Sequence, residues 1–169
     1  MESSKTKFQF SDEALNLSKK IINRYPEGRH KSALLPILHI AQAENKGWLS
    51  VEAMDCVASI LNIQPIEVYE VASFYTMYNL KPVGKYVLEV CRTGPCCLNG
   101  AEDVIDYLQN KLGIKVGETT ADGMFTIKTV ECLASCGTAP MMQVGMYYHE
   151  NLNKEKIDGL LTEFSNSKN

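Results

Sequence analysis

Four cysteines in two short clusters have the residue type and spacing of a metal-binding site. Four residues separate Cys91 from Cys96, and three separate Cys132 from Cys136. Thiolate sulfur is a soft ligand suited to iron–sulfur clusters, and four thiolates satisfy both irons of a [2Fe-2S] cluster. No clustered His or carboxylate competes with them for iron. We therefore interpret these cysteines as the ligands of such a cluster, which the rest of the chain positions.

Two other interpretations of the cysteines remain open. Structural zinc usually takes C-x2-C spacing, which the spacings here match less well, so a zinc-stabilised interaction module is the main metal alternative. A thiol–disulfide oxidoreductase takes a C-x-x-C motif at a helix start, and the sequence has no such motif. Cys97 directly follows Cys96, so either of the two could be the ligand. Cys97 is favoured as a packed thiol beside the site. Cys56 is interpreted as a small core residue.

The cysteine pairs follow two stretches that have the composition of β-strands. Residues 85–90 lead into Cys91 and residues 124–130 lead into Cys132, and both stretches are rich in β-branched and apolar residues. A helix expected over residues 100–112 connects them, which favours parallel strands with a right-handed crossover. Because neighbouring parallel strands end at the same edge of a sheet, we expect all four thiols to converge there.

Residues 81–169 are expected to form a thioredoxin-like α/β domain. Asn99 and Glu102 resemble a capping box for the connecting helix. A hairpin around Gly145 and a final helix over residues 154–164 follow. The resulting order, β-α-β-β-β-α, is the thioredoxin-like arrangement.

Residues 1–80 are expected to form a helical bundle, which makes the whole chain an α+β protein. An irregular tail over residues 1–10 comes first, and apolar residues then recur at helical spacing. Ser11, Ser32 and Ser50 are expected to cap three helices, and a fourth begins with proline. The expected helices cover residues 12–25, 33–44, 51–61 and 65–77.

Other residues with functional potential receive less specific interpretations. The aromatic run from Phe74 to Tyr78 is favoured as core, with a partner surface as the alternative. His30, His39 and His149 are isolated from one another and are not predicted to be ligands.

Composition and charge are those of an ordinary globular protein. The 169 residues carry a net charge of -3, and no long basic run suggests a nucleic acid partner. The longest apolar stretch, about residues 33–43, falls short of the roughly 20 residues of a bilayer span, and the N-terminus lacks a signal or transit pattern. We therefore expect a cytoplasmic chain without membrane insertion. Neither a dinucleotide fingerprint nor a phosphate-binding loop is present, so no nucleotide or flavin site is predicted.

The motifs together resemble the E-type, or 24-kDa, subunit family of NADH:quinone oxidoreductase, respiratory complex I. The resemblance runs from about residue 10 to residue 161 and includes the C-x4-C and C-x3-C spacings. Ser73 stands where the family usually has Thr, and Ala134-Ser135-Cys136 stands for the usual G-A-C. The longest matching runs are Ser32–Pro36, Ala72–Tyr78, Gly117–Gly123 and Glu131–Pro140.

The resemblance implies one [2Fe-2S] cluster in a thioredoxin-like domain, with a helical domain before it. It assigns the ligands, Cys96 rather than Cys97 among them, to Cys91, Cys96, Cys132 and Cys136. It also implies a flavoprotein partner that binds FMN and NADH, and further subunits of the peripheral arm. The cluster would take one electron from FMN, on the cytoplasmic side of the inner membrane. The chain would be part of an oxidoreductase without a complete active site of its own.

The resemblance admits other hosts and suggests one backbone feature. Similar chains serve NAD-linked hydrogenases and formate dehydrogenases, which are the alternative complexes. Thioredoxin-like folds often have a cis-proline near the site, so we expect the peptide bond between Ala139 and Pro140 to be cis.

Overall fold

The computed structural model describes residues 8–167. By its contacts the chain divides into two compact units, residues 1–82 (unit 1) and residues 83–169 (unit 2). Of the expected irregular tail, residues 1–7 lie outside the described residues. Its last part is ordered, because Phe10 is only 7% exposed and its ring packs edge-on against Phe8.

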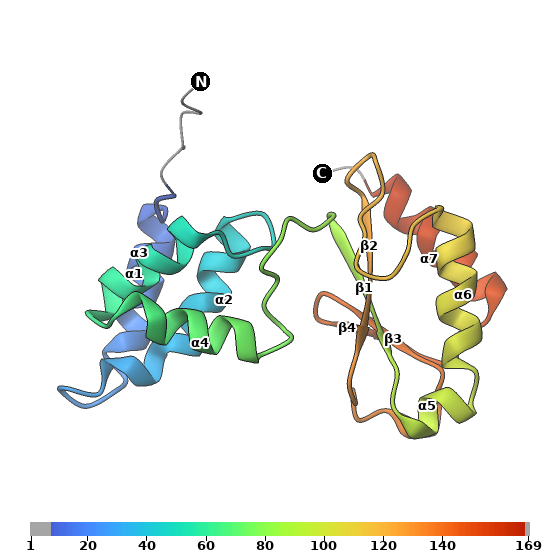
Figure 1. Cartoon of the computed structure of the whole chain (residues 1–169), viewed down its shortest axis with the longest axis horizontal. Coiled ribbons are helices and arrows are strands. Elements are labelled where there is room, and N and C mark those ends of the chain that lie inside the picture. Colours follow the sequence, from blue (N-terminus) through green and yellow to red (C-terminus); the bar gives the residue numbers. More distant parts are fainter. Residues whose placement is uncertain (1–7, 168–169) are drawn as a thin grey trace. The chain divides into compact units, whose positions relative to one another are not determined.

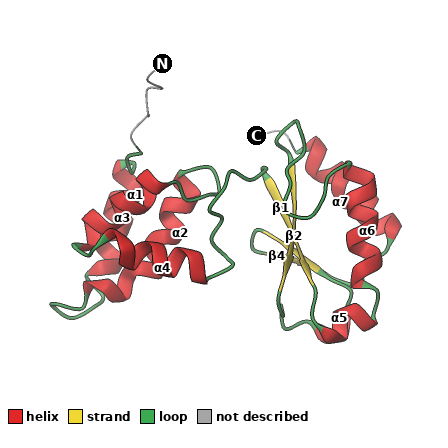
Figure 2. Cartoon of the chain, viewed as in Figure 1, coloured by secondary structure: helices red, strands yellow, loops and turns green. Residues whose placement is uncertain are grey.

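Unit 1 is a bundle of helices (Figures 1 and 2). Its elements are α1 (Asp12–Ile22), the 3-10 helix η1 (His30–Ala33), α2 (Leu34–Glu44), α3 (Val51–Leu61) and α4 (Pro65–Phe74). The apolar faces of these helices enclose one core, whose fully buried side chains include Ile37, Leu38 and Val57. Burial of these faces, rather than intrinsic propensity, stabilises helices this short.

Side-chain caps begin two of these helices as expected. The hydroxyls of Ser11 and Ser50 each accept a hydrogen bond from the backbone N–H three residues along, at 3.2 and 3.1 Å. The expectation for Ser32 is wrong. This residue lies inside η1, and α2 begins after it at Leu34 without a side-chain cap.

The aromatic run after α4 is divided between core and surface. Tyr75 has an extended backbone, so α4 ends at Phe74 rather than at the expected residue 77. Tyr78 turns inward, where it is 4% exposed and its hydroxyl donates to the Leu35 carbonyl at 2.9 Å. Phe74, Tyr75 and Met77 stay exposed. The preference for a core role is therefore right for Tyr78 and wrong for these three residues.

Unit 2 is built on a mixed four-stranded sheet. Its elements are β1 (Tyr86–Cys91), α5 (Gly94–Leu98), α6 (Ala101–Leu112), β2 (Phe125–Val130), the 3-10 helix η2 (Cys136–Thr138), β3 (Met142–Val144), β4 (Tyr147–His149) and α7 (Lys154–Asn166). The strand order is β2-β1-β3-β4, with β1 parallel to β2 and antiparallel to β3. Helices α6 and α7 cover one face of the sheet (Figure 1). The expected α+β class with a thioredoxin-like domain is confirmed.

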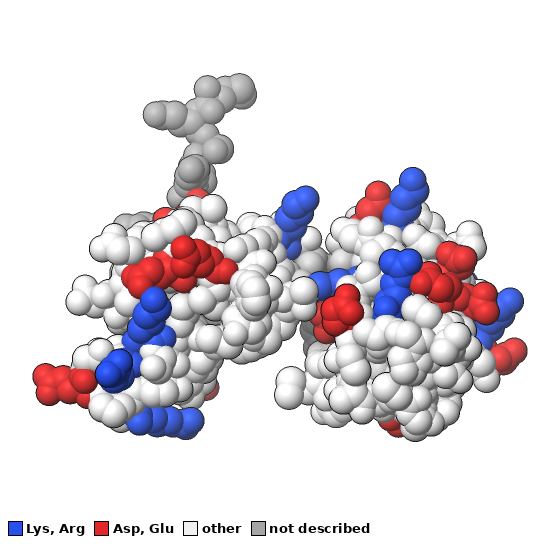
Figure 3. Space-filling view, turned by 60° about the horizontal axis from the view of Figure 1, so that its bottom comes forward, with Lys and Arg blue, Asp and Glu red and all other residues white. Residues whose placement is uncertain are grey.

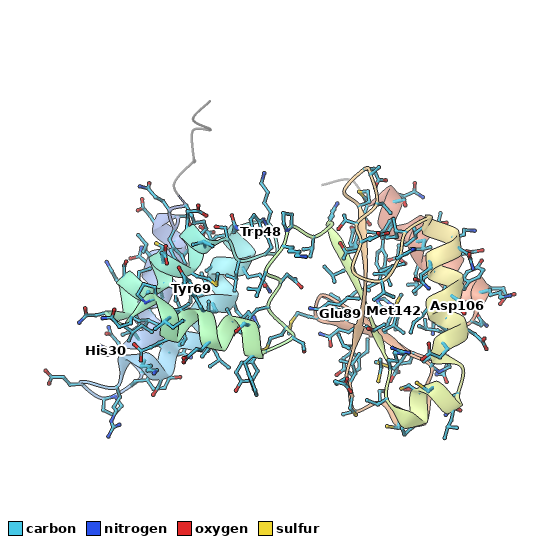
Figure 4. The ribbon with its side chains drawn as sticks, viewed as in Figure 1. His30, Trp48, Tyr69, Glu89, Asp106 and Met142 are labelled. Carbon is cyan, nitrogen blue, oxygen red and sulfur yellow. The ribbon has the colours of Figure 1, made fainter. Side chains whose placement is uncertain are left out.

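Alternation along β1 separates the two faces of this sheet. Leu88 and Val90 are fully buried in the core shared with α6, as is Met142 of β3. Glu89 lies between them in sequence and points to the other face, where its carboxylate is 3.4 Å from the Lys128 ammonium of β2. Figure 4 shows Glu89 and Met142 on opposite sides of the sheet. The core of unit 2 therefore lies between the sheet and its two long helices.

A short helix that was not expected, α5, lies between the first cysteine and α6. The next helix begins only after Gly100, whose φ of 95° is left-handed. The capping box expected between Asn99 and Glu102 at the start of α6 does not form. The Asn99 side chain donates back to the Pro95 carbonyl at 2.7 Å, and Glu102 pairs instead with Arg92 at 2.6 Å. Asn99 therefore closes α5, and no side chain caps α6.

Candidate metal centre

Parallel pairing of β1 with β2 brings the two cysteine loops to one edge of the sheet. Cys91 is the last residue of β1 and lies in register with Val130, the last residue of β2. Cys132 follows Val130 by two residues. Figure 1 shows α5 and the chain that leaves β2 at the same end of unit 2. The strand register therefore places the two cysteine loops at one edge of the sheet, as the sequence predicts.

The first cysteine pair is buried and in direct contact. The Cys91 and Cys96 Sγ atoms lie 3.2 Å apart, and the two residues are 2% and 1% exposed. Helix α5 turns the chain back so that Cys96 faces the end of β1. Ala101 and Met141, both fully buried, pack around the pair. These apolar neighbours keep water away from two thiols that would otherwise sit at the rim of the sheet.

Hydrogen bonds and burial give the two thiols of this pair opposite pKa shifts. Burial alone raises the pKa of Cys91, but hydrogen bonds from Thr93, from the Leu133 backbone and from Cys96 outweigh it and hold this pKa below its ordinary value. Burial raises the pKa of Cys96 to about 11, with a further contribution from the neighbouring Cys91. Cys91 is therefore the more acidic thiol of the pair, and the Cys96 thiol donates a hydrogen bond to its sulfur.

The second pair lies on an exposed loop that reaches the first. Cys132 and Cys136 are exposed, and their nearness contributes to the raised pKa of Cys96. The backbone of Leu133, between them, hydrogen-bonds to Cys91. The Ala134 N–H lies 3.3 Å from the Cys132 Sγ atom. Within residues 8–167, no three His, Cys, Asp or Glu side chains lie close enough together to hold one metal ion.

Two side chains that the sequence pattern did not single out support this loop. The Tyr148 hydroxyl donates to the Leu133 carbonyl at 2.9 Å. The Glu150 carboxylate accepts hydrogen bonds from Ser135 and Thr138, which lower its pKa. The Ala139–Pro140 peptide that follows is cis, as expected.

The remaining cysteines and two of the histidines have contacts of their own. The Cys97 Sγ atom is 3.7 Å from a Glu102 carboxylate oxygen, and burial and this carboxylate raise the pKa of Cys97. Cys56 packs, partly buried, against the core of unit 1. The His39 ring packs against Tyr78, and His149 packs edge-on against Phe164. These ring contacts indicate that His39 and His149 have a packing role.

The donors at this edge fit an iron–sulfur cluster. The four thiols supply the soft ligands that such clusters take. Backbone N–H groups of the second loop supply hydrogen bonds to sulfur, which tune iron–sulfur centres. A family model described as "Thioredoxin-like [2Fe-2S] ferredoxin" matches residues 18–165. The chain belongs to this family.

Relatives of this ferredoxin family match almost the whole chain. The E subunit of the Rickettsia felis NADH-quinone oxidoreductase is 47% identical over 161 residues, which are 95% of this chain and 96% of the relative. Its counterpart from Rickettsia conorii is 45% identical over the same share of each chain. The mitochondrial NADH dehydrogenase [ubiquinone] flavoprotein 2 of Dictyostelium discoideum is 45% identical over 96% of this chain and 66% of its own length.

Solved structures of NAD+-reducing [NiFe]-hydrogenase share the fold of this ferredoxin chain. The air-oxidized form superposes with a TM-score of 0.68 at 21% identity, over 78% of this chain and 22% of that chain. The H2-reduced form also gives 0.68, at 22% identity over 80% and 22%. The chain thus spans about a fifth of the hydrogenase chain, and at this identity the likeness concerns the fold alone. Among the described residues, no helix is long and apolar enough to cross a membrane.

Proposed function

We propose that this chain is the electron-transfer subunit of an NADH:quinone oxidoreductase and carries one [2Fe-2S] cluster. The cluster exchanges a single electron with the FMN of a partner flavoprotein that also binds NADH. The observation that carries the proposal is the convergence of two cysteine loops at one sheet edge, in a chain 47% identical to an NADH-quinone oxidoreductase subunit. The chain contributes to an oxidoreductase without a complete active site of its own.

We further propose that Cys91, Cys96, Cys132 and Cys136 are the cluster ligands. When bound, the cluster supplies one-electron redox chemistry. The buried first pair excludes water from two of the four sulfurs, since both residues are almost fully covered. Backbone N–H groups of the second loop donate to the sulfurs of Cys91 and Cys132. These donors favour the thiolate form that binds iron.

The surface at the cysteine end of unit 2 is suited to close approach by a partner. Figure 3 turns this end toward the viewer, and few charged side chains lie there. Leu98 of α5 is 89% exposed beside the first pair, and Cys132 and Cys136 are exposed on the second loop. A surface with few charges can be covered with little desolvation of charged groups. We place the flavoprotein at this surface and further peripheral-arm subunits around the complex.

Domain organisation and location follow from the same proposal. Residues 1–80 form a helical domain and residues 81–169 carry the cluster. The chain lies on the cytoplasmic side of the inner membrane and is held there through its complex. Purification of the native complex identifies the host, because an NAD-linked hydrogenase or formate dehydrogenase would bring different subunits with the flavoprotein.

Iron and acid-labile sulfide content, with EPR of the reduced protein, test the cluster. We expect two irons and two sulfides per chain and a rhombic signal of one unpaired electron. Zinc without labile sulfide would refute the proposal in favour of a zinc-stabilised module. A redox-active disulfide without metal would identify a thiol oxidoreductase instead.

Two serine variants test the ligand assignment. Cys136→Ser removes a proposed ligand on the second loop, so we expect loss of the cluster or a shorter cluster half-life. Cys56→Ser is the matched control, because Cys56 packs against the core of unit 1. An unchanged spectrum in the Cys136 variant would contradict the assignment.

A further inference from the structure

We propose that Glu150 is a positioning residue that holds the loop of the second cysteine pair in its cluster-binding geometry. The proposal deepens the proposed function and rests on it, since the loop supplies two of the four ligands. Among the described residues, Glu150 forms no hydrogen bond with a cysteine. It acts through Ser135 and Thr138, which flank Cys136 in the chain.

A single carboxylate oxygen of Glu150 accepts hydrogen bonds from residues on both sides of Cys136 in the chain. Thr138 Oγ1 donates to Glu150 Oε1 at 2.6 Å, and Ser135 Oγ donates to the same atom. The two hydroxyl oxygens are themselves only 2.7 Å apart. Each hydroxyl has one proton to donate, so the shared partner must be a group with two lone pairs free on one oxygen atom. An ionised carboxylate is such a group, and it fixes Ser135 and Thr138 side by side.

The backbone next to Glu150 is held against the same loop. The Asn151 N–H donates to the Thr138 carbonyl at 2.7 Å, and the Leu152 N–H donates to the Pro140 carbonyl at 2.9 Å. The Lys156 ammonium, from the first turn of α7, hydrogen-bonds to the Glu150 carbonyl. The carboxylate is therefore presented from a fixed backbone and can restrain the loop.

The second loop depends on such restraints because it contains little regular structure. Only η2, which has three residues, interrupts it between β2 and β3. Ala134 has a φ of 59°, a left-handed conformation that is unfavourable for a non-glycine residue. In this conformation its N–H points at the Cys132 sulfur. Hydrogen bonds that close the far side of the loop keep Ala134 in this state.

Cluster stability in three variants of the full chain tests the proposal. Glu150→Ala removes the acceptor, and we expect the cluster to be lost to a chelator about tenfold faster, with a broader EPR signal. Glu150→Gln keeps an acceptor oxygen, so both measurements should return toward wild type. Glu163→Ala is the matched control and should behave as wild type, because this exposed carboxylate lies in the last turn of α7 and forms no hydrogen bond to residues 132–138 in the described structure.

Amide exchange of the apo chain tests the same restraint without the cluster. Glu150→Ala should speed exchange over residues 133–138, while the strand amides of β1 and β2 keep their protection. Ser135→Ala should act in the same direction and add little to Glu150→Ala, because both changes break one network. Unchanged exchange and unchanged cluster loss in Glu150→Ala would overturn the positioning role. A wild-type chain without labile sulfide would overturn the proposed function instead, and the exchange result would still stand on its own.

Discussion

The sulfur atoms of Cys91 and Cys96 are 3.2 Å apart, although one residue ends β1 and the other lies in α5. Their contact depends on the turn between strand and helix, which directs both side chains into one buried space. The neighbouring thiol of Cys97 points instead toward Glu102. The orientation of one helical turn thus separates two adjacent cysteines into different environments.

Substitution of adjacent cysteines should therefore have unequal effects. We expect Cys96→Ser to lose the cluster or shorten its half-life severely, because it removes a sulfur from the buried pair. We expect Cys97→Ser to retain iron, sulfide and the EPR signal, because the Cys97 thiol contacts Glu102 outside the pair. Iron and sulfide analysis of both purified variants measures the difference. Loss of the cluster in Cys97→Ser with retention in Cys96→Ser would reverse the assignment.

Gly84 should not tolerate a larger side chain. A Cβ atom there would lie 2.9 Å from backbone atoms of Met124 and Phe125, and the Gly84 N–H donates to Thr126 Oγ1 at 2.7 Å. Because backbone must move to admit the Cβ, we expect Gly84→Ala to reduce the free energy of unfolding by about 1–3 kcal/mol. Denaturant unfolding of the full chain measures this loss. Gly159 is the matched control, because it lies in α7 where a Cβ would meet no atom within 4 Å, and Gly159→Ala should be neutral or stabilising.

Ser18 should be a site where a smaller side chain stabilises the fold. This residue of α1 is fully buried, and its hydroxyl has no hydrogen-bond partner within the part of the chain described. A buried hydroxyl without a partner costs about 1–3 kcal/mol. We expect Ser18→Ala to raise the free energy of unfolding by about 1 kcal/mol. Ser59→Ala, at an exposed helical serine whose hydroxyl donates to the Asp55 carbonyl at 3.0 Å, removes no buried unpaired hydroxyl, and an equal gain there would contradict this explanation.

Tyr78 should make stability depend on alkaline pH. Burial, with a smaller contribution from Tyr75, raises the pKa of Tyr78 to about 12. The folded state therefore holds this proton more tightly than the unfolded chain, whose tyrosine has its ordinary value near 10. The resulting stabilisation is complete below about pH 10 and is lost as the pH rises toward 12.

The variant Tyr78→Phe isolates this effect. It cannot ionise, so its free energy of unfolding should fall less steeply between about pH 10 and pH 12 than that of wild type. At neutral pH it should be less stable by about 1 kcal/mol, because the hydrogen bond to Leu35 is lost. Denaturant titrations followed by far-UV circular dichroism measure both quantities. Parallel pH profiles for the two proteins would contradict the assignment to Tyr78.

Sequence patterns predicted the strands and their pairing. They did not predict the local geometry of the site as well. Strands β1 and β2 were recognisable because apolar β-branched runs end directly before cysteines, and a helix of normal length separates them. Helix α5 was missed because five residues are too few for a helical period. Once α5 exists, Asn99 closes it, so the local pattern that suggested a capping box no longer applies.

Contacts distant in sequence could not be predicted from local patterns. The Glu150 carboxylate lies 15 residues from Ser135 and 12 from Thr138, and the hairpin of β3 and β4 brings them together. A Glu after a strand carries no signal of such a role. Tyr78 illustrates the same limit, because its aromatic neighbours in the run share its character, yet only the fold decides that its side chain turns inward.

The unequal exposure of the two cysteine pairs also gives cluster assembly a direction. Cys91 and Cys96 are almost fully covered, whereas Cys132 and Cys136 are open to solvent. Iron and sulfide that arrive from solvent therefore meet the second pair first. Leu133 of the second loop packs against the first pair, so the hydrogen bonds that hold this loop in place also keep the first pair covered.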